Sequence, residues 1–335
     1  MISVDIPKKD HTVLDSILDA MKKAQTAFVT CHARPDGDAL GSSLMLYEVL
    51  TSFNIDTEIV CPSPPPETYS FLKNVDKVKT RVPEGNKDIG FILDSSDTKR
   101  LEGVSGLLES TDTLINIDHH KLNEKFGKLN YVRPKYASVC EQVMYLAMKA
   151  GVQINSDMAV NIYIGILTDT DRFQEQNTTP QSHRIAADLI EHFINPVKIS
   201  TLVYGNCSAN KMKLIARTLD TLEFSAGGKV GYITITPEVL KKTGASNENV
   251  EGIINYARNI KGVEVGILFR KIPGLEGIKV SFRSNGKIDV GSIAVEFGGG
   301  GHHNASGCLF KGSFKKAHKK IIGAVEREVK ELKKS

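Results

Sequence analysis

The stretch His32-Ala33-Arg34-Pro35-Asp36-Gly37-Asp38 places an imidazole and two carboxylates on one short loop. The apolar residues 27–31 before it predict a buried strand, and a helix is predicted to begin near residue 39. Acids this close repel each other unless a positive group lies beside them. A divalent cation supplies that charge, because such cations bind carboxylate and imidazole groups. The other interpretation is a polar strand-to-helix turn with Asp38 near the helix N-cap.

Two further apolar stretches end on acids in the same way. Residues 89–93 end on Asp94, and residues 114–117 end on Asp118-His119-His120. Strands at 27–31, 57–60, 89–93 and 114–117 alternate with helices at 39–53, 137–150, 156–168 and 180–193, which predicts an α/β fold with a doubly wound parallel sheet. Ligands bind at the carboxyl ends of the strands in such sheets. We therefore expect Asp36, Asp38, Asp94 and His119 to meet at one edge.

Asp169 adds a fifth acid, at the end of the helical pattern 159–167. A carboxylate at a helix C-terminus opposes the helix dipole, so a compensating cation nearby would stabilise it. The alternative is an ordinary helix-terminal turn made of small polar residues.

Composition sets the class of protein. With 335 residues the chain is long enough for two domains, and 41% hydrophobic and 24% charged residues are typical of a globular protein. The net charge of +4 allows an anionic substrate without requiring long nucleic acid. Five scattered cysteines, no apolar signal core and no membrane-length apolar run predict a cytoplasmic protein with reduced thiols.

A second region follows a weakly patterned stretch at 195–208. It contains predicted strands at 228–235, 263–269 and 278–282, the last two forming a hairpin, and predicted helices at 209–222, 247–260 and 289–297. The run Gly298-Gly299-Gly300-Gly301-His302-His303 is either a flexible linker or a loop whose N–H groups approach an anion, with His302 as a further donor. Arg283 is either a surface arginine or a phosphate ligand. The lysine-rich helix 314–333 is interpreted as a solvated face, with nucleic-acid contact as the alternative.

In this order and at these separations, the motifs resemble the DHH–DHHA1 phosphoesterases over nearly the whole chain, and most of all the nanoRNase / pAp phosphatase branch. The resemblance implies a DHH catalytic domain at 1–194, a linker at 195–212 and a smaller α/β DHHA1 domain that binds substrate at 213–335. It also implies hydrolysis of short oligoribonucleotides to mononucleotides, and of pAp to AMP, at two manganese ions, with Mg²⁺ or Co²⁺ as alternatives.

Roles follow from the resemblance residue by residue. One metal would be held by His32, Asp36 and Asp94, and the other by Asp38, Asp94, His119 and Asp169. Asp118 would orient a ligand, and His120 would face the substrate phosphate. The substrate contacts of the second domain would be Arg283, Gly300, Gly301 and His302. Asp171 and Gln174 depart from the family pattern, which commonly has a small and a basic residue there.

Several alternatives remain at this stage. The basic C-terminal signature of family II pyrophosphatases is absent, the chain is too short for a RecJ exonuclease, and the transmembrane segments of membrane-bound cyclic dinucleotide phosphodiesterases are missing. A soluble cyclic-di-AMP or pApA phosphodiesterase and a non-catalytic nucleotide sensor stay open. The expected partners are short RNA or small nucleotides such as pAp and pApA, with no long duplex and no membrane. A homodimer is left open.

Overall fold

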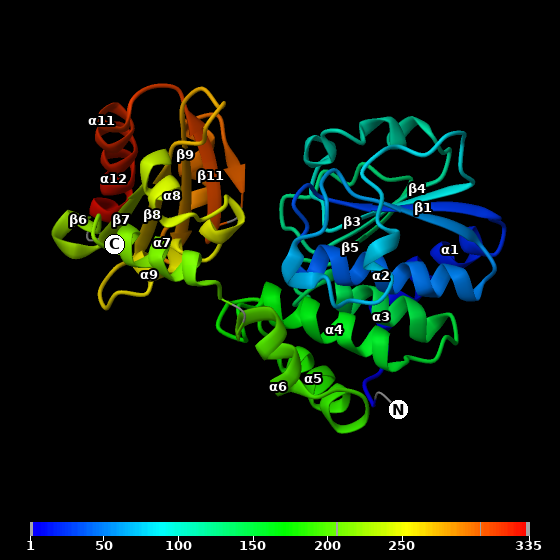
Figure 1. Ribbon diagram of the computed structural model, residues 1–335. Coiled ribbons are helices and arrows are strands. Elements are labelled where there is room, and N and C mark those ends of the chain that lie inside the picture. Colours follow the sequence, from blue (N-terminus) through cyan, green and yellow to red (C-terminus); the bar gives the residue numbers. More distant parts are fainter. Residues whose placement is uncertain (1–2, 206, 302, 333–335) are drawn as a thin grey trace. The chain divides into compact units, whose positions relative to one another are not determined.

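The computed structural model describes residues 3–205, 207–301 and 303–332. The chain forms two compact units, Met1–Asn206 and Cys207–Ser335, each with its own sheet and core (Figure 1). The predicted linker at 195–212 contains the short helix α6 (Pro196–Ser200) and the start of α7 (Ala209–Leu219). No helix in the described part of the chain has both the length and the apolar character needed to cross a membrane.

Five parallel strands form the sheet of the first unit in the order β2-β1-β3-β4-β5. They are β1 (Thr26–Cys31), β2 (Asp56–Val60), β3 (Ile89–Leu93), β4 (Leu114–Asp118) and β5 (Leu129–Val132). The predicted parallel α/β sheet is therefore confirmed, with β5 as an added strand that the pattern did not indicate. The strand order reverses between β1 and β3, which is the point where open α/β sheets bind their ligands.

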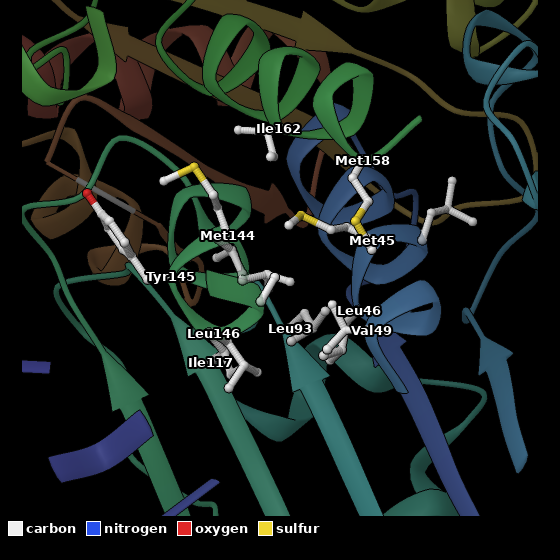
Figure 2. Close-up of a cluster of buried hydrophobic side chains, with 14 of the residues drawn as sticks. Met45, Leu46, Val49, Leu93, Ile117, Met144, Tyr145, Leu146, Met158 and Ile162 are labelled. Carbon is white, nitrogen blue, oxygen red and sulfur yellow. The ribbon is translucent and has the colours of Figure 1, made fainter. Parts of the chain in front are cut away.

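Helices cover one face of this sheet. They are α1 (His11–Met21), α2 (Gly37–Ser52), α3 (Val139–Lys149) and α4 (Ser156–Asp169), followed by α5 (Pro180–His192). Figure 2 shows how the core is built: Leu93 of β3 and Ile117 of β4 point toward side chains of α2 and α3 such as Val49 and Leu146. The opposite face, with Phe28 and Ile92, is covered by the 3₁₀ turns Thr98–Leu101 and Ser105–Glu109 in place of α-helices.

The helix α2 begins earlier in the sequence than predicted, within the acidic loop. The helix begins at Gly37, and Asp36 is its N-cap, accepting hydrogen bonds from the N–H groups of Asp38 at 3.1 Å and Ala39 at 3.0 Å. The predicted helix start near residue 39 is therefore two residues late, and the N-cap is Asp36, two residues before Asp38. Since Asp36 satisfies the first N–H groups, Asp38 is inside the first turn and fully buried.

The second unit has a mixed sheet in the order β10-β11-β9-β8-β7-β6, in which only β7 and β8 pair in parallel. Its strands are β6 (Glu223–Ser225), β7 (Val230–Ile235), β8 (Val265–Arg270), β9 (Ile278–Ser284), β10 (Gly300–Gly301) and β11 (Ala305–Phe310). Its remaining helices are α8 (Pro237–Thr243), α9 (Ile254–Arg258), α10 (Val290–Glu296), α11 (Phe314–Ala317) and α12 (Gly323–Leu332).

Two predictions for the second unit have opposite outcomes. The hairpin is confirmed, because β8 and β9 pair antiparallel. The helix predicted at 247–260 is wrong, because Gly252 has a φ of +80° and divides the segment into the 3₁₀ turn Glu248–Val250 and the short α9. The periodic apolar residues were present, but the left-handed glycine interrupts the helical backbone.

Candidate active site

The predicted acids and histidines of the first unit converge where the strand order reverses. His32 follows β1, Asp94 follows β3, His119 follows β4, and Asp169 ends α4. Ligand atoms of three residue sets lie within 4.8 Å of one another: His32, Asp36 and Asp94; Asp38, His119 and Asp169; and Asp94, His119 and His120. Four separate segments of the chain therefore supply one cluster of side chains, and Asp94 belongs to two of the three sets.

His32 and His119 both direct Nε2 toward the carboxylates. His32 donates from Nδ1 to the carbonyl oxygen of Ala33 at 3.0 Å, and His119 donates from Nδ1 to that of Tyr136 at 3.2 Å. These bonds leave Nε2 facing the acids, at 3.2 Å from Asp94 Oδ2 for His32 and 3.4 Å from Asp169 Oδ2 for His119. A backbone bond at one nitrogen with the other nitrogen directed at acids is the usual arrangement of a metal-binding imidazole.

Asp38 is held rigidly by the start of α3. Its two carboxylate oxygens accept hydrogen bonds from the N–H groups of Val139, at 2.7 Å, and Cys140, at 2.8 Å. The helix α4 makes room for it at Gly165, where a Cβ would lie 2.7 Å from Asp38 Oδ1. Each carboxylate oxygen keeps a second lone pair, so Asp38 is fixed in place and can still bind a cation.

Asp94 lies at the centre of the cluster and carries signs of strain. Its φ is +51°, which is uncommon outside glycine, and such backbone strain gathers at functional sites. Its side chain is 3% exposed, and Oδ1 has no hydrogen-bond partner among the described residues. The nearest imidazole nitrogens to Oδ1 are His120 Nδ1 at 3.5 Å and His119 Nε2 at 3.6 Å. A buried carboxylate oxygen without a hydrogen bond is costly, and a bound cation would satisfy it.

The electrostatics of the cluster indicate an excess of negative charge. Burial alone would lower the pKa of the two histidines, yet Asp94 and Asp36 raise the pKa of His32 to about 10, and Asp169 and Asp94 raise that of His119 to about 10. Burial and the charge of Asp94 raise the pKa of Asp38 to about 7. Protons therefore neutralise the cluster, and a metal ion would replace them.

A second layer of polar residues supports the cluster, and most of it went unpredicted. The predicted pair is Asp118 and His120, whose Nδ1 donates to Asp118 Oδ1 at 2.6 Å. Asn123 donates to the other oxygen of Asp118 at 2.6 Å, and Arg100 Nη1 lies 3.1 Å from His120 Nε2. Asn177 donates to Asp169 Oδ2 at 2.9 Å. Asn123 and Asn177 lie in loops without periodic pattern, and no sequence signal marks them as parts of the site.

The predicted contacts of the second unit lie on neighbouring strands. Arg283 on β9 pairs with Ala305 on β11, and Gly301 on β10 pairs with the adjacent Ser306. Gly301 has a φ of +139°, and a Cβ there would lie 2.6 Å from Ser306 Cα, so only glycine fits. Gly300 has open space around its Cβ direction, and His302 lies outside the described residues.

The cluster of the first unit fits a metal ion. It combines buried carboxylates, imidazoles with fixed Nε2 atoms, and one oxygen without a hydrogen bond, which are the properties of sites for divalent cations. Asp171, by contrast, forms an ion pair with Arg172 at 2.9 Å.

Comparison with known proteins assigns the family. Residues 26–166 match the model of the DHH family N-terminal domain, and residues 227–331 match the DHHA1 domain. The bifunctional oligoribonuclease and PAP phosphatase NrnA of Thermus thermophilus is 32% identical, with 90% of each chain covered. The protein of the same name from Bacillus subtilis is 30% identical over 82% of this chain and 86% of its own length. A crystal structure of an exopolyphosphatase-related protein from Bacteroides fragilis has a TM-score of 0.90 at 27% identity, covering 99% of this chain and 100% of that one. The predicted family is thereby confirmed: the chain belongs to the DHH family, with a DHHA1 domain as its second part.

Proposed function

We propose that this protein is a metal-dependent phosphoesterase that hydrolyses short oligoribonucleotides to mononucleotides and pAp to AMP. The observation that carries the proposal is the cluster of three overlapping ligand sets at the strand-order reversal of a DHH domain. The curated names of the Thermus and Bacillus relatives support the substrate class. The catalytic, linker and substrate-binding boundaries at 194 and 212 are part of the same proposal.

The same proposal places two ions in the cluster. His32, Asp36 and Asp94 would hold the first, and Asp38, Asp94, His119 and Asp169 would hold the second, so Asp94 would be common to both. Mixed carboxylate and imidazole donors suit Mn²⁺, with Mg²⁺ or Co²⁺ as alternatives. When bound, such a pair of ions lowers the pKa of a water molecule and neutralises charge on a phosphoryl group.

The protein's own side chains position the reacting groups. Asp118 accepts a hydrogen bond from His120 Nδ1 and so fixes the ring with Nε2 directed away from Asp118. Both residues are buried, so water does not compete for this bond. His120 is therefore held next to Asp94, where the phosphate of a substrate would lie against the cluster. Asp118 acts by orienting His120, and His120 acts on the phosphate.

The second unit supplies the remaining contacts in this proposal. Arg283 offers a planar fork that matches a phosphate, and Gly301 lets the backbone approach an anion closely. Gly300 and His302 complete the set. The names of the Thermus and Bacillus relatives support a short RNA or a small nucleotide as the molecule that these residues contact.

The test is the release of mononucleotide from an RNA dinucleotide and of AMP from pAp, each with Mn²⁺ and with a chelator. We expect turnover with Mn²⁺, none with the chelator, and none for Asp94→Asn. A panel with pApA and cyclic-di-AMP ranks the substrates. Tight nucleotide binding without turnover would reject the hydrolase in favour of a sensor, and turnover of cyclic-di-AMP alone would reject the RNA substrate.

A further inference from the structure

Arg100 is a positively charged residue at the edge of the acidic cluster, and the proposed function does not yet assign it a role. It lies in the 3₁₀ turn Thr98–Leu101, directly after the loop that carries Asp94. Its backbone carbonyl accepts a hydrogen bond from the N–H of Ala33 at 3.1 Å, which ties the turn to the loop that carries His32. The side chain is half-buried. Its place relative to the site is therefore set by two of the segments that supply the cluster.

The partner of its guanidinium is unusual for a half-buried arginine. Nη1 lies 3.1 Å from His120 Nε2. An arginine can only donate, so Nε2 must accept, and the His120 proton resides on Nδ1, which donates a hydrogen bond to Asp118. The Arg100 side chain thus donates one hydrogen bond to an uncharged ring nitrogen. Among the described residues, no carboxylate forms an ion pair with Arg100.

An arrangement of this kind points to a missing anion. A guanidinium has five N–H donors, and burying it without a negative partner costs free energy unless a ligand uses them. Arginine forks match the oxygens of a phosphate, and the adjacent His120 lies in the same set of atoms as Asp94 and His119.

We propose that Arg100 binds a non-bridging oxygen of the reacting phosphate, and that His120 holds its guanidinium ready in the free protein. The inference rests on the proposed phosphoesterase function and adds a substrate-contacting residue from the first unit. Arg100 then adds a positive charge and two N–H donors beside the phosphate. A lysine would supply the charge without the planar fork, so Arg100→Lys should be an incomplete replacement.

The experiment measures how much the phosphate group adds to binding. AMP and adenosine are titrated calorimetrically into the full chain in the presence of Mn²⁺, for the wild type and for Arg100→Ala, Arg100→Lys and Lys99→Ala. We expect Arg100→Ala to lower the affinity for AMP about 10- to 100-fold, the usual effect of losing hydrogen bonds to a charged group, without changing that for adenosine. The affinity of Arg100→Lys for AMP should lie between those of the wild type and Arg100→Ala. Lys99→Ala, which changes a neighbouring exposed residue, should bind AMP like the wild type.

A second pair of variants separates contact from positioning. If Arg100 only orients His120, Arg100→Ala has no further effect on AMP binding in a His120→Asn background; if it touches the phosphate, the loss persists there. An unchanged AMP affinity in Arg100→Ala, or a loss that disappears in the His120→Asn background, overturns the inference. A wild type without Mn²⁺-dependent turnover overturns the proposed function instead, so the two failures are distinguishable.

Discussion

The side chain of Asn177 donates a hydrogen bond to Asp169 Oδ2 at 2.9 Å and so fixes the carboxylate that ends α4. The same amide also donates to the carbonyl oxygens of Asp169, at 3.1 Å, and Ala137, at 2.9 Å. It therefore joins the end of α4 to the segment before α3. We predict that Asn177→Ala weakens Mn²⁺ binding about 10- to 100-fold, the usual cost of removing a group that orients a ligand. Isothermal titration calorimetry with Mn²⁺ measures this change in affinity.

A matched control uses the nearby amide of Gln181. It donates to the hydroxyl of Tyr145 at 3.0 Å and, within the described part of the chain, forms no hydrogen bond with the acids of the cluster. Gln181→Ala should bind Mn²⁺ like the wild type. Equal affinity for Asn177→Ala and Gln181→Ala would show that Asp169 needs no support from Asn177.

A methyl group at Gly165 should displace Asp38. The Cβ of an alanine there would lie 2.7 Å from Asp38 Oδ1 and 2.4 Å from Cys140 Sγ, so α4 must shift away from α2 and α3. We expect Gly165→Ala to destabilise the protein by about 1–3 kcal/mol, the usual cost of overpacking a core, and to reduce Mn²⁺ affinity. Urea unfolding and Mn²⁺ titration measure the two effects.

Gly323→Ala makes the same chemical change in a different environment. Gly323 begins α12 and has no atom within 4 Å of its Cβ direction. There the substitution should raise the free energy of unfolding by about 0.5–1 kcal/mol, because alanine loses less backbone entropy in a helix. Should Gly165→Ala behave like Gly323→Ala, close packing around Asp38 has no part in the site.

Substitution of Arg283 tests the second unit. If its guanidinium binds a substrate phosphate, Arg283→Ala should raise KM for an RNA dinucleotide about tenfold or more and change kcat less, because the reacting groups lie in the first unit. Arg217→Ala removes an equally charged but 70% exposed side chain of the same unit and serves as the control. Steady-state kinetics with both variants would contradict the role if KM is unchanged or if the control shows the same increase.

The sequence predicted those site residues that follow strands, but it did not predict those whose role depends on how helices pack. His32, Asp94 and His119 follow strands that the sequence pattern indicates, and the topology of a parallel sheet brings such strand ends together. Asn177 and Gly165 are different. Their importance comes from the crossing of α4 over α2 and α3, and neither an amide in a loop nor a glycine in a helix indicates that crossing in the sequence.

The errors have equally local causes. The helix α2 starts at Gly37 because Asp36 turns its carboxylate back onto the first N–H groups, and a loop with two acids allows either one to be the N-cap. The strand β5 is short, and its residues Leu129-Asn130-Tyr131-Val132 alternate too briefly to indicate a strand. It forms because the exposed edge of β4 pairs with it.

Thermal unfolding tests the metal site without any substrate. A ligand present at about 100 times its Kd adds about 2.7 kcal/mol to stability, and a unit of this size gains roughly 2–4 °C in Tm per kcal/mol. We therefore expect Mn²⁺ to raise the transition of the first unit by roughly 5–10 °C and a chelator to reverse the shift. The transition of the second unit, which has none of the clustered ligands among its described residues, should stay in place.

Asp94→Asn should abolish the shift in Tm, because it removes a charge common to two ligand sets. Asp56→Asn, which changes an exposed residue, should keep the shift. A full shift in Asp94→Asn would mean that the cation binds elsewhere.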